Sequence, residues 1–493
     1  MPARRTALAP RALLTAAPLA LLLVALAVHP LAADDEAPLE TRTQAAINEI
    51  LNEPDLPSAI WGIHVRDLES GRTVYSHNAD KNLIPASNLK LFTTAAALDV
   101  LGPDYRYVTR LYFDGSTTAD GTLRGDLIIR GSGDPTFGSR HAAGEDPFEA
   151  WARALRESGV RRVEGRLIGD DDAFEDNPYA EGWDVWHIAT ESYAPGAGGL
   201  AYADNLVELN LSGSNVRTDP AGYVEVRSRP RTRRGGGYSP FSVERELGTN
   251  TIYLNGAVSS RYRGTMLIPI DNPTRFALHA FAEALREEGI TVDAGRYDVD
   301  DLDSPPRYDG QEPLFTHVSP PLSEIVRRVN QRSDNFYAEQ VFRTLSEDGS
   351  TRGGTRRVLA FLENAGVETD GLSIRDGSGL SRKDLVTPAS MVGLLERMNR
   401  HPARAAFFAS LPEGGSASST LRNRLSGVPV RAKTGSLEYV RALSGYVTAP
   451  NGHRYAFSVI ANNYTTNGSA IASAMDRIVR ALATGQRVPA AEG

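Results

Sequence analysis

The feature that most constrains this chain is a loop leading into a helix at residues 85–98, which carries Ser87 and Lys90 three positions apart. Pro85 favours a turn, and the alanines at 95–97 favour a helix. Residues three apart share one face of a helix, so the two side chains are expected to meet. Apolar residues flank the lysine, so we expect burial to lower the pKa of Lys90 and free its amine as a base for the serine hydroxyl.

A simpler interpretation makes Ser87 a helix cap and Lys90 a surface residue. The composition argues against it. Of the 53 basic residues only four are lysines, Lys81, Lys90, Lys383 and Lys433, and the other 49 are arginines. Arginine stays protonated whereas lysine can lose its proton. Each lysine in this arginine-rich chain is therefore a candidate for chemistry, and two of the four lie in short motifs; Lys383 lies outside them and receives no role.

Length and composition indicate a soluble protein of several domains. A chain of 493 residues exceeds one ordinary core and predicts two or three domains. Its hydrophobic content of 41% and charged content of 23% are typical of globular proteins. The net charge of −8 argues against general nucleic-acid binding. The chain has no cysteine, which excludes disulfides, thiolate metal sites and a catalytic thiol, and we expect neither cofactor nor metal.

The N-terminal segment has the pattern of a secretory signal peptide. Arg4, Arg5 and Arg11 precede an apolar run at residues 16–28, and small residues at 32 and 33 are followed by acidic ones. The run is short for a membrane span, although an uncleaved anchor is the alternative. We therefore predict a signal peptide at residues 1–33 and a periplasmic or otherwise extracytoplasmic location. Membrane contact is expected to be peripheral at most.

The pattern of predicted secondary structure changes twice along the chain. Residues 34–105 predict a helix, a β-hairpin at 59–77 and then the Ser87 segment, whereas residues 105–310 are dominated by short strands. Within that region, residues 170–172 predict a solvated acidic loop more readily than a cation site. After residue 317 longer helices return, one of them reaching from 322 to 337. Strands at 431–437, 442–448 and 455–461 predict an antiparallel meander, followed by a closing helix at 469–482.

Three motifs occur in one order along the chain. They are Ser87-x-x-Lys90, Ser333-Asp334-Asn335 and Lys433-Thr434-Gly435. Each alone is weak, but the ordered set is the one found in serine β-lactamases and penicillin-binding proteins. We therefore interpret the three as parts of a single site.

Further stretches carry a closer resemblance over nearly all of the chain after residue 33. They are residues 85–93, 131–136, 272–275, 376–381, 420–424 and 433–437. With them the chain resembles the type-4 penicillin-binding proteins, the class C low-molecular-mass D-alanyl-D-alanine carboxypeptidases/endopeptidases. The segment 411–419, with Gly414-Gly415-Ser416-Ala417-Ser418, departs from the usual form of that family. The departure affects the geometry expected for this loop and leaves the expected chemistry unchanged.

The resemblance implies an α/β (α+β) fold. Its catalytic domain would be serine β-lactamase/transpeptidase-like, an antiparallel sheet flanked by helices, with inserted strand-rich domains. Ser333 lies 246 residues after Ser87, far more than one such domain needs, and the family carries insertions at this point. We expect a catalytic domain at 34–105 and 311–493, an inserted domain II at 106–210 and 267–310, and an inserted domain III at 211–266.

The motifs supply candidates for the catalytic steps. Ser87 is the expected nucleophile that becomes acylated, and Lys90 is expected to take its proton. Ser333 can relay a proton between Lys90 and the leaving amine.

Five further residues are candidates for substrate binding. Asn335 can hold the substrate amide, Lys433 contributes positive charge, and Thr434 can bond the terminal carboxylate. Gly435 leaves room for a substrate along the strand edge. The resemblance implies that the backbone N–H groups of Ser87 and Ser436 form the oxyanion hole.

These features predict a serine D,D-peptidase. It would hydrolyse D-Ala-D-Ala termini, D-Ala-diamino acid cross-links of peptidoglycan, or both, through an acyl-enzyme on Ser87. Its partners would be peptidoglycan stem peptides, with β-lactam antibiotics as inhibitors and no nucleic acid. The alternatives are a non-catalytic cell-wall-binding scaffold, which would need none of the motif residues, and a serine β-lactamase, which would need a deacylating group and a compact chain. A Ser-His-Asp hydrolase is disfavoured because no Gly-x-Ser-x-Gly elbow is present.

Overall fold

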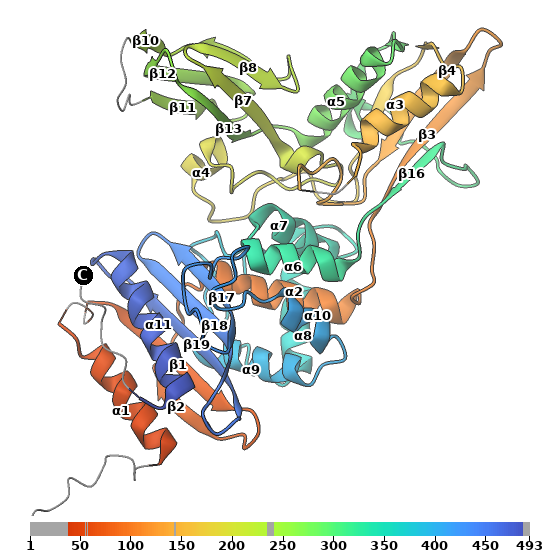
Figure 1. The fold of residues 1–493 in the computed structure, drawn as a ribbon. Coiled ribbons are helices and arrows are strands. Elements are labelled where there is room, and N and C mark those ends of the chain that lie inside the picture. The colour runs from red at the N-terminus through yellow and green to blue at the C-terminus, as the bar shows by residue number, and fades with distance from the viewer. Residues whose placement is uncertain (1–37, 55, 57, 142–143, 234–240, 487–493) are drawn as a thin grey trace, which may run out of the picture. The chain divides into compact units, whose positions relative to one another are not determined.

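The computed structural model describes residues 38–54, 56, 58–141, 144–233 and 241–486 (Figure 1). The predicted signal peptide at 1–33 lies outside these residues. No helix of the described part is long and apolar enough to cross a membrane.

A five-stranded antiparallel sheet is built from both ends of the described chain. Its strand order is β17-β18-β19-β1-β2. The strands are β1 (Ile60–Asp67), β2 (Thr73–His77), β17 (Val430–Leu437), β18 (Val440–Thr448) and β19 (Arg454–Asn462). The β1–β2 hairpin and the three-stranded meander agree with the sequence prediction. Because β1 pairs with β19 along its whole length, residues far apart in sequence share one sheet.

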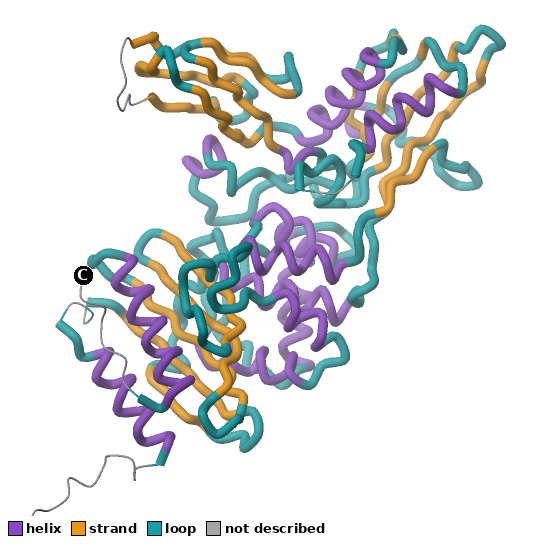
Figure 2. The backbone as a smooth tube through the Cα atoms, viewed as in Figure 1, coloured by secondary structure: helices purple, strands orange, loops and turns teal. Residues whose placement is uncertain are grey.

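Helices cover both faces of this sheet, as Figure 2 shows. Successive side chains of a strand point to opposite faces, and those of β18 enter two different cores. Ala442 and Tyr446 pack with the helices α2 (Lys90–Val100) and α9 (Pro388–Asn399). Leu443 and Val447 pack with the terminal helices α1 (Leu39–Leu51) and α11 (Gly468–Thr484). The expected antiparallel sheet flanked by helices is thus present.

The remaining helices on the α2 side form one core with it. They are α6 (Leu322–Arg332), α7 (Asn335–Thr344), α8 (Thr351–Asn364) and α10 (Arg404–Ser410). The sequence predicted a continuous helix from 322 to 337, and this is wrong. Ser333 adopts a left-handed conformation with φ of 59°, which ends α6. The Asp334 side chain then accepts a hydrogen bond from the Tyr337 N–H and caps α7.

Residues 108–318 contribute three further sheets. The largest has seven strands: β3 (Val108–Thr117), β4 (Thr122–Arg130), β5 (Arg162–Val163), β6 (Leu167–Asp170), β14 (Thr291–Val292), β15 (Arg296–Asp298) and β16 (Phe315–Val318). Helices α3 (Pro147–Glu157) and α5 (Pro273–Glu287) share a core with it. Asp146 caps α3 and Asn272 caps α5, each with proline at the first helical position.

Two smaller sheets share a separate core. One contains β7 (Leu206–Ser212), β8 (Asn215–Asp219) and β13 (Arg263–Pro269). The other contains β9 (Glu225–Ser228), β10 (Arg231–Arg233), β11 (Phe241–Arg245) and β12 (Thr251–Ser259). Side chains of β7, β12 and β13 meet in their common core. The short helix α4 (Val185–Thr190) contacts β11 and β13.

Candidate active site

The Ser87 segment forms a short 3-10 helix, η2 (Ala86–Leu89), that runs directly into α2. Ala86 has a φ of 47°, which turns the chain sharply just before the serine. Two glycines allow other segments to approach this turn closely. A Cβ on Gly379 would lie 1.9 Å from the Ala86 carbonyl oxygen, and one on Gly435 would lie 2.6 Å from that of Pro85. The serine is therefore fixed between the 376–381 loop and strand β17.

Lys90 reaches Ser87 as its spacing predicted. The Lys90 Nζ lies 2.9 Å from the Ser87 Oγ. It also donates to the Asn335 Oδ1 at 2.6 Å and to the Ser378 carbonyl oxygen at 2.6 Å. These three partners use all three donors of an ammonium group. The lysine is thus held in a single position beside the serine hydroxyl.

The surroundings of Lys90 shift its proton affinity. Its side chain is completely buried. Burial lowers the pKa of Lys90 to about 8, against the opposing effect of the nearby carboxylates Asp376 and Glu339. The predicted lowering is confirmed. A lysine with this pKa exchanges its proton readily near neutral pH, as a general base must.

Ser333 pairs with the second motif lysine. The Lys433 Nζ donates to the Ser333 Oγ at 2.9 Å and to the Thr434 carbonyl oxygen at 2.7 Å. Lys433 is also completely buried, and burial followed by repulsion from Lys90 lowers its pKa well below the ordinary value. The left-handed turn at Ser333 separates the two helices and aims this hydroxyl at the lysine. The structure thus gives Ser333 a hydrogen bond to Lys433, whereas the sequence analysis linked it to Lys90.

Asn335 joins Lys90 to the strand-rich region. Its Oδ1 accepts from Lys90, and its Nδ2 donates to the Tyr193 carbonyl oxygen at 2.8 Å. Tyr193 is 43% exposed. The amide is therefore held from both sides beside Ser87, on the surface where a substrate would approach.

The motif on β17 lies along the edge of the five-stranded sheet. One side of β17 pairs with β18. On its other side, residues 412–414 cover the start of the strand, but no strand of the described chain pairs with residues 433–437 there. The Thr434 Oγ1 donates to the Thr420 Oγ1 at 2.8 Å, which brings the 420–424 stretch to the site. Ser436 is exposed. Gly435 has a second reason to be glycine, because a side chain would strike the Ser87 segment.

A group of buried carboxylates behind Lys90 was missed at the level of sequence. Asp376 accepts five hydrogen bonds, from the Ser378, Gly379 and Ser381 N–H groups, the Ser378 hydroxyl and the Trp183 Nε1. Burial and this carboxylate raise the pKa of Glu339 to about 8 and that of Asp384 well above its ordinary value. The sequence analysis used residues 376–381 only for the resemblance, and it gave no role to Glu339, which lies in α7, or to Asp384, which lies later in the same loop.

Segment 181–193 contributes two further contacts near the site. The Trp183 indole donates to Asp376 at 2.9 Å, and this bond is buried. Lys383, which received no role from the sequence, forms an ion pair with Glu181. The long stretch between the first two motifs therefore contacts the loop that supports Lys90.

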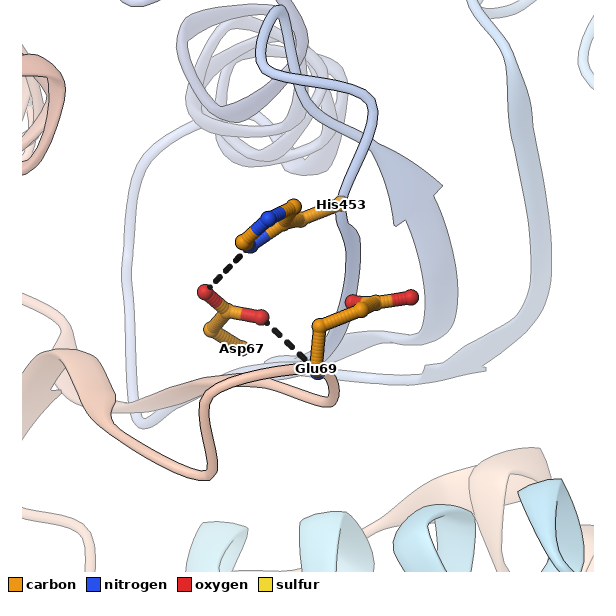
Figure 3. Close-up of side chains that lie close together, drawn as sticks. All are labelled: Asp67, Glu69 and His453. Carbon is orange, nitrogen blue, oxygen red and sulfur yellow. Dashed lines mark hydrogen bonds and ion pairs between the residues drawn. The ribbon is translucent and has the colours of Figure 1, made fainter.

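Two groups of side chains in the described residues have the spacing of metal ligands. One is Asp67, Glu69 and His453, shown in Figure 3. Both oxygens of Asp67 and one oxygen of Glu69 already have donors. Asp67 accepts from the His453 ring, the Ser70 hydroxyl and two backbone N–H groups, and Glu69 accepts from the Arg454 N–H. These bonds, His453 first, lower the pKa of Asp67 to about 2 despite its burial. Asp67 and His453 thus form an ion pair that joins two turns of the sheet, and Glu69 bonds to the backbone beside it.

Comparison with known proteins gives a consistent result. Residues 43–483 match the D-Ala-D-Ala carboxypeptidase 3 (S13) family. A D-alanyl-D-alanine carboxypeptidase from Actinomadura sp. (strain R39) is 34% identical over 490 residues, covering 93% of this chain and 87% of the relative. The resemblance expected from the motifs is thereby confirmed.

Solved structures support the fold. Penicillin-binding protein 4 from Haemophilus influenzae superimposes with a TM-score of 0.74 at 23% identity, covering 85% of this chain and 94% of that one. A predatory peptidoglycan endopeptidase from Bdellovibrio bacteriovorus gives a TM-score of 0.51 at 17% identity, covering 88% of this chain and 96% of that one. The α/β (α+β) fold class is confirmed.

Proposed function

The chain belongs to the D-Ala-D-Ala carboxypeptidase 3 (S13) family, and we propose that its serine-type peptidase activity proceeds through an acyl-enzyme on Ser87. The observation that carries the proposal is the 2.9 Å distance between the Lys90 Nζ and the Ser87 Oγ, together with the complete burial of Lys90. A serine hydroxyl needs such a base beside it to attack a carbonyl.

In the proposed acylation step, neutral Lys90 takes the Ser87 proton while the Oγ bonds to the carbonyl carbon of the penultimate D-alanine. The C–N bond to the terminal residue then breaks, and its amine needs a proton. The Ser333 hydroxyl bonded to Lys433 is placed to supply it, because its hydrogen bond to that lysine lets it be reprotonated. Water later hydrolyses the ester on Ser87 and restores the enzyme.

The proposed substrate lies along the free edge of β17. A peptide pairing there would extend the five-stranded sheet. Thr434 would bond the terminal carboxylate, with Lys433 adding positive charge, and Asn335 would hold the substrate amide. The backbone N–H groups of Ser87 and Ser436 would stabilise the oxyanion. The unpaired edge at 433–437 and the exposure of Ser436 support this arrangement.

The ligands proposed for this site are peptidoglycan stem peptides and, as inhibitors, β-lactam antibiotics. Two solved relatives bear on this. One structure of the Haemophilus influenzae protein is a β-lactam complex, and the Bdellovibrio relative is called a peptidoglycan endopeptidase. A chain acting on such a substrate must be exported, which agrees with the signal-peptide pattern at 1–33.

We also propose the domain division that the sequence suggested, with three boundaries refined. The five-stranded sheet takes its strands from 34–105 and 311–493, in support of one catalytic domain. Strand β16 pairs with β3, so the second part of that domain would begin after β16. Strands β7 and β13 share a core with 211–266, so domain III would extend over 206–269 and domain II would hold the seven-stranded sheet.

Intact-mass spectrometry after treatment with benzylpenicillin tests the acyl-enzyme. The wild-type chain should gain the mass of one drug molecule, and Ser87→Ala should gain none. Ser436→Ala is the matched control, since its proposed contribution is a backbone N–H that the substitution keeps. An adduct that persists in Ser87→Ala, or that maps to another residue, would contradict the assignment.

A further inference from the structure

Two parallel strands of the seven-stranded sheet end side by side in a cluster of carboxylates. Strand β15 pairs with β6, with Asp298 opposite Gly169. Asp171 directly follows β6, and Asp300 lies in the 3-10 helix η4 (Val299–Asp301) after β15. One carboxylate oxygen of each of Asp171, Asp298 and Asp300 lies within 4.8 Å of the other two. Pairing of two distant strands therefore creates the cluster.

One member of the cluster carries an unsatisfied oxygen. Asp298 is only 8% exposed, and its Oδ1 is buried with no hydrogen-bond partner in the described chain. A buried carboxylate oxygen without a donor is costly, and native structures normally provide a hydrogen or a cation for it. The cluster at Asp67 differs in this respect, because both Asp67 oxygens accept hydrogen bonds, among them the two drawn in Figure 3. The missing partner at Asp298 is the observation that points to a ligand.

The surrounding charge favours a cation as that ligand. Further carboxylates lie close by at positions 170, 172, 176 and 301. Two arginines oppose them, Arg130 at 3.8 Å from Asp170 and Arg275 at 3.0 Å from Asp301. The cluster therefore holds more negative charge than its arginines balance.

We propose that Asp171, Asp298 and Asp300 bind a divalent cation, with Ca²⁺ as the best fit. The donor set consists of carboxylate oxygens, which suit hard cations and offer no nitrogen or sulfur for zinc or copper. Oxygens within 4.8 Å of one another can each lie about 2.3–2.6 Å from a shared ion, the range of Ca²⁺–oxygen bonds. The ion would tie η4 to the end of β6 and leave room for water as the remaining ligands.

The site also explains why the sequence favoured a solvated acidic loop at 170–172. An EF-hand draws its ligands from one loop, whereas this site would use one residue of that loop and two from a distant strand end. Asp172, the exposed neighbour of Asp171, is outside the set of three. Asp172 therefore offers a control with the same change of charge in the same loop.

The test uses the purified full chain after removal of divalent ions with EDTA. Calorimetric titration and thermal unfolding are measured with CaCl₂ and MgCl₂, and with NaCl at equal ionic strength. We expect one Ca²⁺ per chain, a higher Tm with CaCl₂ than with NaCl, and tighter binding of Ca²⁺ than of Mg²⁺. Asp298→Asn should weaken Ca²⁺ binding by about tenfold or more, and Asp172→Asn should leave it nearly unchanged.

Three results would overturn the proposal. One is that the wild-type chain binds neither ion at about 10 mM, beyond the affinity range of extracellular calcium modules. Another is that NaCl raises the Tm as much as CaCl₂ does, which would indicate screening alone. The third is an equal loss in Asp172→Asn and Asp298→Asn. If the buried substitution prevents folding, Asp300→Asn decides between the outcomes, because that side chain is exposed.

Discussion

Lys90 and Lys433 are both completely buried, yet the two regions around them differ in charge. Around Lys90, Asp376 and, once it ionises, Glu339 oppose the effect of burial, and the pKa of Lys90 stays at about 8. Around Lys433 the neighbouring charge is Lys90 itself, which adds to burial and lowers the pKa much further. Two lysines of one site are thus given different proton affinities by the segments that enclose them.

The difference suggests that Lys90 and Lys433 have different roles in the reaction. Lys90, with three acceptors and a carboxylate behind them, can hold a proton or release it near neutral pH. Lys433 has two acceptors and no such carboxylate, so an incoming substrate carboxylate would stabilise its charged form. We infer that Lys90 is the base for Ser87, whereas Lys433 acquires its positive charge when substrate binds and can then reprotonate Ser333. The predictions below test this comparison.

The largest effect is expected from Lys90→Arg. A guanidinium stays protonated and cannot accept the Ser87 proton. Acylation by benzylpenicillin should slow by about 10²–10⁴-fold or more, the size of a general-base contribution. Stopped-flow measurement of acylation at several pH values checks this, with circular dichroism as the control for folding.

Lys433→Arg should have a smaller effect on acylation, because position 433 needs positive charge more than proton exchange. We expect a loss of about tenfold or less in acylation by benzylpenicillin, and a deeper loss of turnover on D-Ala-D-Ala peptides, because turnover requires hydrolysis of the ester on Ser87 as well as its formation. Both rates are measured side by side with those of Lys90→Arg. Equal, mild losses at the two positions would mean that Lys90 is not the base.

The local part of this site could be predicted from sequence. Ser87 and Lys90 are three residues apart, so helical geometry alone brings them together. The apolar neighbours of Lys90 predicted that its side chain is buried. The strands of the five-stranded sheet were predictable for the same reason, since alternation of apolar residues is a local signal. Where one segment determines a contact, its pattern suffices.

The remaining contacts depend on where separate segments meet. The left-handed conformation of Ser333, with a φ of 59°, interrupts a helical pattern, and the capping residue Asp334 was a local sign that the sequence analysis did not use. The bond between Ser333 and Lys433 spans 100 residues. Glu339 lies in α7 whereas Asp376 and Asp384 lie in the loop before α9, and Asp171 meets Asp298 only through the pairing of β6 with β15. These sites become visible only when the fold is known.

The pH dependence of acylation is a third way to test the comparison. A base with a pKa of about 8 is roughly one-tenth neutral at pH 7 and nine-tenths neutral at pH 9. The acylation rate of the wild-type chain should therefore rise about tenfold between pH 7 and pH 9. Asp376→Asn removes an anion that raises the pKa of Lys90, so the inflection should move to lower pH. An unchanged inflection would mean that Asp376 does not raise the pKa of Lys90.

The smallest effect on activity is expected from Glu339→Gln. Burial, then Asp376, raises the pKa of Glu339 to about 8, so this side chain is mostly protonated at pH 7 and glutamine imitates it. Acylation at pH 7 should stay within about twofold of wild type, with a difference appearing above pH 8, where glutamate ionises and glutamine does not. A large loss at pH 7 would show that Glu339 carries charge there and would place a second anion behind Lys90.

Stability supplies an independent measurement for the same variant. A carboxyl group whose folded pKa is raised stabilises the fold fully below its unfolded pKa, near 4.5, and loses that contribution as pH rises through about 8. The wild-type chain should therefore lose stability relative to Glu339→Gln between about pH 5 and pH 8. Urea unfolding at several pH values measures the difference. A constant difference across this range would mean that the pKa of Glu339 is not raised. Glu339 would then be ionised at pH 7, and a second negative charge would lie behind Lys90.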